Sequence, residues 1–206
     1  MNPKGLKVFS PYIDICNRAS PEQLGQKEAR AKMGLNNVNL EGLRKAAKAA
    51  QADASKAKRL NRLEGTWNLE EGQPQFQARV KFEGGETTLE SDQPSFLGGG
   101  GSRPGPLVYC LYGMASCFAA TFAILAAQEG VALRSLRVVA EGELDFSRVF
   151  GIAERPVVEG VRVTLFVESE ASEEKIQELE DLARDRCPAV YCLTKPIPLV
   201  TQVKRE

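Results

Sequence analysis

The feature that most constrains this sequence is a run of 21 residues without a charged side chain, from Leu107 to Ala127. A run of that length meets the minimum for a transmembrane helix. Its composition argues against a membrane span, because six of its residues are alanine, it contains polar residues and two cysteines, and no basic cluster flanks it. A helix that is uncharged all round is equally expected at the centre of a soluble fold. We therefore predict a buried central helix.

Alternating apolar and polar residues on both sides of this run predict antiparallel β-structure. Before it, Phe76–Phe82 alternates and is followed by Gly84-Gly85, which predicts a hairpin with one buried face. After it, residues 133–144 and 157–167 are rich in valine and leucine and predict two long strands. The glycine-rich stretch from 92 to 106 lacks the lysine that ends a phosphate-binding loop, so we expect a mobile loop there.

The C-terminal part of the sequence predicts one more helix and one more strand. Ser172 is a good N-cap, and a single apolar stripe runs from Ile176 to Cys187. Pro188 disfavours helical geometry at Cys187, so the helix should bend or restart there. Residues 196–203 contain two prolines and predict a final strand at a sheet edge. Together these elements predict an α+β domain over residues 66–206.

Residues 1–65 differ from this domain in charge and pattern. They hold 13 basic and 6 acidic residues, so their net charge is +7, and the rest of the chain balances it to zero. We expect two helices, over about 20–36 and 39–62, that form a basic arm and dock on the acidic domain of their own or a neighbouring subunit. The docking residues should be leucines at the ends of the second helix, namely Leu40, Leu43, Leu60 and Leu63. Few aromatic residues are interspersed for base stacking, so we expect no nucleic-acid partner.

The absence of histidine limits the chemistry that this chain can perform. Without it, the chain cannot build a Ser-His triad, an imidazole base or the usual zinc sites by itself. Five cysteines are an odd number and too few for a disulfide scaffold. The sequence also shows no basic start with an apolar run before a small-residue cleavage site, so we expect a reducing cytoplasm. We predict no cofactor and no metal, although a four-cysteine site is an arrangement that the residues leave open.

The cysteines are the candidates for chemistry. Cys117 lies in the middle of the uncharged helix and Cys187 at the proline-broken end of the next one, so the two could face each other across a helix pair. A thiol held in that way can be oxidised to a sulfenic acid and captured by its neighbour. Cys110 and Cys192 are alternatives to the two members of this pair. Each of the four could equally be a small core residue.

Several motifs in this order resemble those of the OsmC/Ohr family, the osmotically inducible and organic hydroperoxide resistance proteins. The resemblance covers roughly residues 75–203 and leaves the arm outside it. The residues that carry it are Gly105-Pro106-Leu107-Val108-Tyr109-Cys110-Leu111-Tyr112-Gly113-Met114-Ala115-Ser116-Cys117, Ala126-Ala127-Gln128-Glu129-Gly130-Val131, Glu141-Gly142-Glu143-Leu144-Asp145, Arg186-Cys187-Pro188-Ala189-Val190 and Pro196-Ile197-Pro198.

The resemblance implies an intertwined homodimer, with long central helices between antiparallel sheets and active sites at the subunit interface. It implies that Cys117 is the peroxidatic cysteine and Cys187 the resolving one, and that a dithiol reductant supports reduction of organic hydroperoxides or hydrogen peroxide. Family peroxidases also use an arginine near the first hairpin and a glutamate about ten residues before the first cysteine. Here Glu86 and Leu107 stand at those places.

These departures leave two functions open. Without a nearby cation, a thiol in an apolar helix has a raised pKa and reacts slowly. Arg79 is our candidate for the missing cation, and Arg103 is an alternative. The first interpretation is a cysteine-based peroxidase without a membrane or nucleic-acid partner. The second is a catalytically silent binding or assembly protein whose cysteines are core residues.

Overall fold

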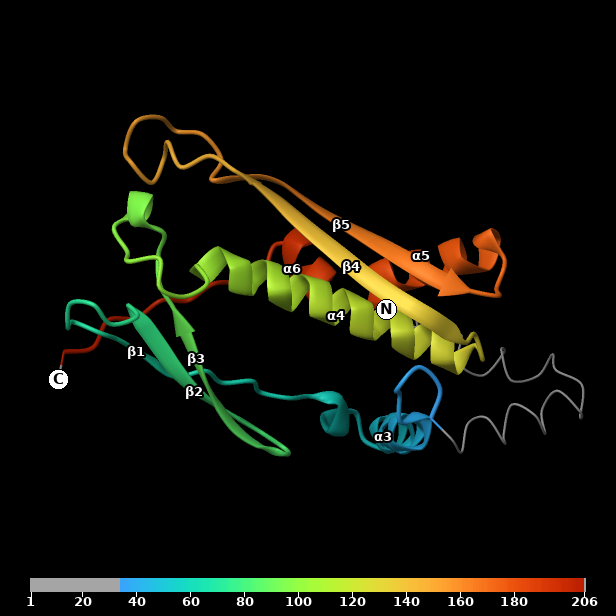
Figure 1. Cartoon of the computed structure of the whole chain (residues 1–206). Helices are drawn as coiled ribbons and strands as arrows, with labels where there is room; N and C mark the ends of the chain where they lie inside the picture. The colour runs from blue at the N-terminus through green and yellow to red at the C-terminus, as the bar shows by residue number, and fades with distance from the viewer. Residues whose placement is uncertain (1–33, 206) are drawn as a thin grey trace, which may run out of the picture.

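A long central helix packs beside a two-stranded sheet, and a separate three-stranded sheet precedes it in the chain. The computed structural model describes residues 34–205. The central helix is α4, Pro106–Gln128, and the strands β4, Leu133–Leu144, and β5, Val158–Ser169, lie along it (Figure 1). Helices α5, Glu173–Arg186, and α6, Pro188–Thr194, follow and pack against α4. The chain is thus an α+β fold, as the sequence predicts.

Helix α4 begins and ends where the local sequence favours it. Pro106 occupies the first helical position, where its missing N–H would have no intrahelical partner. Gly130 follows the C-cap with φ of 73°, a conformation that glycine adopts without strain. The helix meets the length and hydropathy criteria for a membrane span, and 33% of its most apolar window is buried. That buried part packs against β4 and α5.

The long strands confirm the alternating pattern. β4, Leu133–Leu144, pairs antiparallel with β5, Val158–Ser169, and the two are joined by a loop. One face of the pair contacts α4 and α5 through residues such as Leu136 and Val167. On the opposite face, the Arg137 guanidinium lies 3.7 Å from the centre of the Phe166 ring. The alternation therefore separates a core face from an exposed face.

The first sheet contains the predicted hairpin and one additional strand. β2, Phe76–Phe82, pairs with β3, Gly85–Ser91, and the short strand β1, Gly65–Trp67, pairs with the other edge of β2. Gly85 has φ of 152°, so the turn needs glycine at this position. The sequence prediction did not include β1, because three residues are too few for a pattern to be recognised.

The two C-terminal helices meet at the predicted break. The Ser172 hydroxyl accepts a hydrogen bond from the backbone N–H of Lys175 and caps α5. Cys187 has extended geometry and separates α5 from α6, and Pro188 is the first residue of α6. The Lys175 Nζ atom lies 3.6 Å from Glu129 Oε2, which connects the start of α5 to the end of α4. Helix α5 therefore runs antiparallel to α4.

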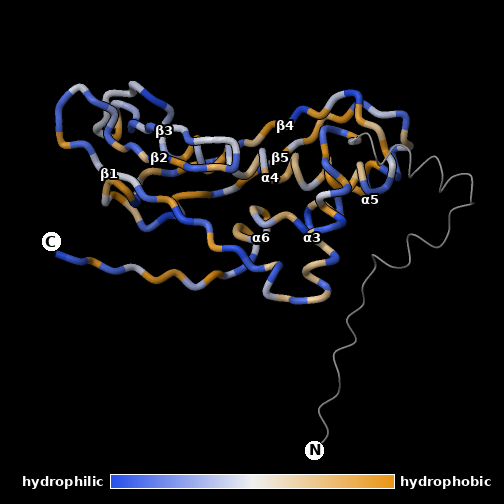
Figure 2. The backbone as a smooth tube through the Cα atoms, turned by 90° about the horizontal axis from the view of Figure 1, so that it is seen from below, coloured by the Kyte–Doolittle hydropathy of each residue, from blue (hydrophilic) through white to orange (hydrophobic). Residues whose placement is uncertain are grey.

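Two predicted elements are wrong. The helix expected over residues 39–62 is shorter than predicted and forms α3, Leu40–Ala52. It ends there because the Asp53 side chain accepts a hydrogen bond from the Ser55 N–H and starts a 3-10 turn, Ala54–Ala57. The strand expected over 196–203 is an exposed, unpaired segment, and Figure 2 shows hydrophobic stretches along it. Its two prolines remove two ladder donors. The helix expected from about residue 20 lies mostly outside the described residues.

The described part of the arm docks on its own domain, although through fewer leucines than expected. Leu40 is buried against Ala127 at the end of α4, and Leu43 packs beside it. Leu60 is 91% exposed and Leu63 is also exposed, so neither of these two leucines docks on the domain of its own chain. The helix ends at Ala52 and is followed by the 3-10 turn, Ala54–Ala57, so both leucines lie beyond these elements.

Candidate functional site

Two cysteines that lie 70 residues apart in the sequence meet at the α4–α6 helix pair. The Cys117 and Cys187 Sγ atoms are 3.6 Å apart. Both sulfurs are free thiols. Cys187 is fully buried, whereas Cys117 is half-buried. Oxidation of either thiol would therefore place a nucleophilic sulfur next to an electrophilic one.

The local sequence around Cys187 explains why the sulfurs converge. Leu179, Ala183 and Cys187 follow the apolar stripe of α5 and are all fully buried against α4. On α4, Phe118 and Phe122 belong to the same core. Because α5 ends at this core and restarts as α6, the Cys187 thiol is directed at the middle of α4.

The Cys117 thiol experiences opposing effects. Burial raises its pKa, and the backbone N–H of Ala189, at the start of α6, lowers it by donating a hydrogen bond to the sulfur. The neighbouring thiol of Cys187 raises the pKa further, because two sulfurs this close do not both ionise, and Cys192 adds a smaller effect of the same sign. The net result is a raised pKa, so a single chain leaves Cys117 mostly protonated at neutral pH.

The other cysteines occupy different environments. Cys110 on α4 and Cys192 on α6 are both exposed, and neither belongs to the buried pair. Cys16 lies outside the described residues. Between residues 34 and 205, no group of three or more potential metal ligands converges, so the four-cysteine site that the residues left open does not form.

The candidate arginines are both engaged in ion pairs elsewhere. Arg79 on β2 is 71% exposed, and its guanidinium lies 3.8 Å from the carboxylate of Glu86. Arg103 donates from Nε to the Glu90 carboxylate at 2.6 Å. Within one chain, the structure does not bring Arg79 to Cys117. Leu107, at the place where family peroxidases carry a glutamate, is a half-buried apolar residue in the first turn of α4.

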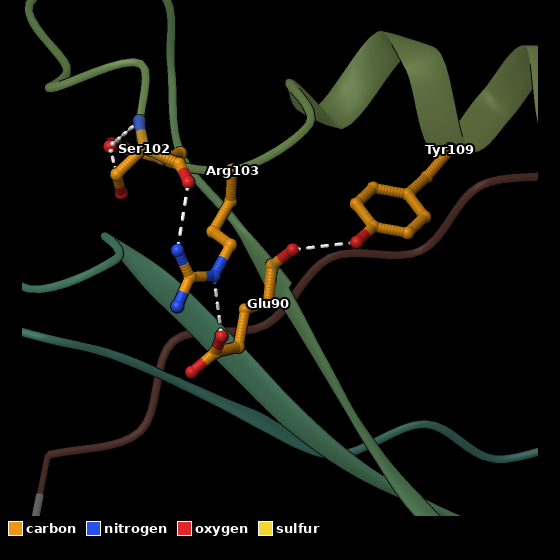
Figure 3. A network of polar contacts seen from close by, with 5 residues as sticks. Glu90, Ser102, Arg103 and Tyr109 are labelled. Carbon is orange, nitrogen blue, oxygen red and sulfur yellow. Dashed lines mark hydrogen bonds and ion pairs between the residues drawn. The ribbon is translucent and has the colours of Figure 1, made fainter.

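Sequence reasoning missed a polar network at the start of α4. The Tyr109 hydroxyl donates to the backbone carbonyl of Glu90 at 2.6 Å, and Arg103 bridges the Glu90 carboxylate and the Ser102 carbonyl (Figure 3). The network fixes the end of β3 against the first turn of α4. Its members are spread over 20 residues without a spacing rule, so only the fold reveals it.

The glycine-rich stretch that we expected to be mobile is anchored by Asp92. Its buried carboxylate accepts hydrogen bonds from the Gly100 N–H and from both the N–H and the hydroxyl of Ser102. The Ser102 backbone hydrogen bond contributes most to lowering the pKa of Asp92. These hydrogen bonds to a single carboxylate therefore hold the loop in place despite its glycines.

Neither of two cavities described in residues 34–205 opens onto the cysteine pair. One, of about 260 Å³, lies between α4, β5 and α5 and includes Phe118 and Phe122 in its wall. The other, of about 220 Å³, lies between the first sheet and Pro106. Neither of these two cavities is lined by Cys117 or Cys187.

The comparison with protein families decides the identity. The family model described as OsmC-like protein matches residues 99–202, which include both cysteines and the whole of α4, β4, β5, α5 and α6. The chain belongs to the OsmC-like family. None of the curated proteins compared with it matches.

Several solved structures are similar to this chain. An osmotic stress induced and detoxification response protein from Psychrobacter arcticus superposes with a TM-score of 0.50 at 14% identity, covering 66% of this chain and 89% of that one. An OsmC-like protein from Mycoplasma pneumoniae gives 0.47 at 21% identity, with 66% and 89% coverage. An organic hydroperoxide resistance protein from Legionella pneumophila gives 0.47 at 19%, with 66% and 92% coverage. At these identities the likeness concerns the fold alone.

Proposed function

We propose that this OsmC-like protein is a thiol-dependent peroxidase of the cytoplasm that reduces organic hydroperoxides or hydrogen peroxide. In this proposal Cys117 is the peroxidatic cysteine and Cys187 the resolving one. The observation that carries it is the 3.6 Å separation of the two Sγ atoms, which come from elements 70 residues apart. A core built only for packing has no need to place two thiols in contact at the break between two helices.

The chemistry follows from this contact. The Cys117 thiolate attacks the terminal peroxide oxygen, the O–O bond breaks, and the leaving oxygen takes a proton to become alcohol or water. Cys117 is left as a sulfenic acid. The Cys187 sulfur then attacks the Cys117 sulfur, and the sulfenic hydroxyl leaves as water with the Cys187 proton. A dithiol reductant regenerates both thiols by exchange.

Because burial raises the pKa of Cys117, the proposed reaction requires a cation that favours the thiolate. We infer a homodimer in which the partner subunit supplies it at the interface, with Arg79 as the candidate. Two observations support the dimer. On α4, Val108 and Tyr112 are exposed, and on the first sheet Trp67 and Phe82 are exposed. Apolar surface of this extent on a soluble chain is typical of an interface.

The raised pKa also favours a second candidate function. A catalytically silent OsmC-like binding or assembly protein needs no thiolate, and the Glu86 ion pair then explains why Arg79 is held on the hairpin. This alternative predicts that the cysteine pair is inert toward peroxide at neutral pH.

Stoichiometric oxidation distinguishes the two functions. Reduced protein is mixed with one equivalent of an organic hydroperoxide, and both peroxide loss and disulfide-linked peptides are measured. The peroxidase proposal expects loss in the wild type, none in Cys117→Ser, and sulfenic acid without a disulfide in Cys187→Ser. Cys16→Ser is the matched control for the change of thiol to hydroxyl. If the wild type and Cys117→Ser consume peroxide equally slowly, the silent alternative stands.

A further inference from the structure

The arm connects two points that are fixed on the central helix. At one end Leu40 of α3 packs against Ala127, in the last turn of α4. At the other end β1 belongs to the first sheet, which is tied to the start of α4 by the hydrogen bond from the Tyr109 hydroxyl to the Glu90 carbonyl. Residues 58–64 lie between these points without helix or strand, and we call them the strap (Figure 1). The strap therefore bridges the two ends of α4.

Both fixed points lie on one face of α4. Tyr109 is seven residues before Ser116, and Ala127 is seven residues after Ala120, so each pair shares nearly the same side of the helix. Ser116 and Ala120 are four residues apart, which joins the two pairs into one stripe. Tyr112, four residues before Ser116, belongs to the same stripe. The first sheet and α3 are therefore attached at opposite ends of this stripe.

The middle of the stripe is uncovered. Tyr112 is 71% exposed, Ser116 and Ala120 are exposed as well, and a Cβ atom added at Gly113 would meet no neighbouring segment within 4 Å. At 1.5 Å per residue, the uncovered stretch from Tyr112 to Ala120 is about 12 Å long, which matches the diameter of one helix with its side chains. A helix therefore fits across this face.

The strap carries apolar side chains that its own chain does not cover. Leu60 is 91% exposed and Leu63 is 60% exposed. Arg59 donates hydrogen bonds to the carbonyls of residues 56 and 58, and Arg62 forms an ion pair with Glu64. Among the described residues, these polar contacts stay within the arm. The two leucines are thus available to a second molecule.

A second copy of the chain fits this place in shape and in charge. Its α4 has the same uncharged stripe, in which Ser116 and Ala120 have small side chains that let two helices approach closely. Contact between identical faces about a two-fold axis is the commonest arrangement in soluble oligomers. The strap holds three basic residues and one acidic residue, whereas residues 66–206 carry a net charge of −7. The strap therefore complements the domain of a second copy.

We propose that the strap closes over a second copy of the chain seated on the uncovered stripe of α4, with Leu60 and Leu63 packing on that copy. By two-fold symmetry, each chain supplies one strap and receives the other. The proposal uses the homodimer inferred above and does not depend on peroxidase activity. The strap lies outside residues 99–202, which the family model matches, so it adds to the interface of the matched domain.

Crosslinking tests where Leu60 lies. In the full-length protein, p-benzoylphenylalanine is incorporated in place of Leu60, and the dimeric protein is irradiated. We expect a covalent dimer on denaturing gels, with crosslinked peptides from residues 66–206 of the other chain. Leu69, which is 90% exposed between β1 and β2, is the matched control position and should give far less covalent dimer. Crosslinks from position 60 confined to one chain, including its residues 1–33, would overturn the proposal.

The dimer dissociation constant measures what the two leucines contribute. Leu60→Ser and Leu63→Ser should each raise it by about 10-fold or more in sedimentation experiments, because each removes apolar surface buried between the chains. Leu69→Ser should leave it unchanged. Both strap leucines are exposed within one chain, so neither substitution should unfold it.

The outcomes separate this inference from the proposed function. A dimer whose dissociation constant is the same in wild type, Leu60→Ser and Leu63→Ser overturns the strap and leaves the dimer and the peroxidase proposal standing. A wild-type protein that sediments as a folded monomer at micromolar concentration rejects both the strap and the dimer. Peroxide consumption is measured on the same wild-type sample, so a dimer with an effective strap and no peroxide consumption rejects the peroxidase alone.

Discussion

Replacing Asn36 with glycine should release the arm from the domain without straining the backbone. The Asn36 Nδ2 atom donates to the Val131 carbonyl at 2.9 Å, and the Leu133 N–H donates to Asn36 Oδ1 at 2.9 Å. These hydrogen bonds connect the arm to the turn between α4 and β4. Asn36 has φ of 58°, which glycine adopts freely, so the substitution removes the side chain while the backbone conformation stays accessible.

The expected size follows from the two hydrogen bonds. Each contributes about 0.5–1.5 kcal/mol net, so losing both costs about 1–3 kcal/mol. The neighbouring Asn37 provides a matched control, because it has φ of 59° and an exposed side chain. Asn37→Gly carries the same increase in unfolded-state entropy. The difference between the two variants therefore isolates the hydrogen bonds.

Hydrogen exchange at the Leu133 amide measures this difference directly. At about 1.4 kcal/mol for each factor of ten, exchange should be about 5- to 150-fold faster in Asn36→Gly than in Asn37→Gly. Amides in the middle of β4 should change less, because the opening is local. Equal exchange at Leu133 in the two variants would refute the view that Asn36 holds the arm in place.

Three further predictions concern the core, the loop and the site. Leu179→Ala, at a fully buried position, should lower the free energy of unfolding by about 2–5 kcal/mol in urea titrations, whereas Leu199→Ala at an 86% exposed position should leave it nearly unchanged. Because the pKa of Asp92 is lowered in the folded state, its contribution to stability is present above the unfolded pKa and is lost as the pH falls through the folded one. The stability gap between wild type and Asp92→Asn should therefore narrow on acidification, and a constant gap would contradict this. Burial raises the pKa of Cys117, so its alkylation in Arg79→Gln should have a midpoint above that of an unperturbed thiol, and the wild type, in the proposed dimer, should have a lower midpoint than this variant. Equal midpoints in the two proteins would remove Arg79 from the site.

The sequence predicted the elements whose signals are local and repeated. The uncharged run and the alternation in β4 and β5 each extend over ten residues or more, and the structure has these elements within a residue or two of the predicted bounds. The break at Pro188 was equally predictable, because a proline restricts the residue before it whatever the tertiary structure. These signals also placed Cys117 and Cys187 on neighbouring helices.

The features that could not be predicted from the sequence are of two kinds. In some, two local conformations compete, and in others the interacting residues are far apart in the chain. The alanine-rich pattern after Ala52 continues a helical period, but the Asp53 side chain offers the backbone another hydrogen bond. The segment 196–203 has strand-like composition without a neighbour to pair with in its own chain. The ion pair between Arg103 and Glu90 joins a loop to a strand and follows from no spacing.

The separation of Cys117 and Cys187 has a consequence for the lifetime of the molecule. A bond between them would close a ring that contains β4, β5 and α5. For a ring of 70 residues, the chain-entropy model gives about 4 kcal/mol of stabilisation through the unfolded ensemble. Where proteolysis acts on the unfolded chain, the oxidised protein would then be degraded more slowly than the reduced one. Exposure to peroxide would therefore lengthen the lifetime of the protein as well as change the state of its sulfurs.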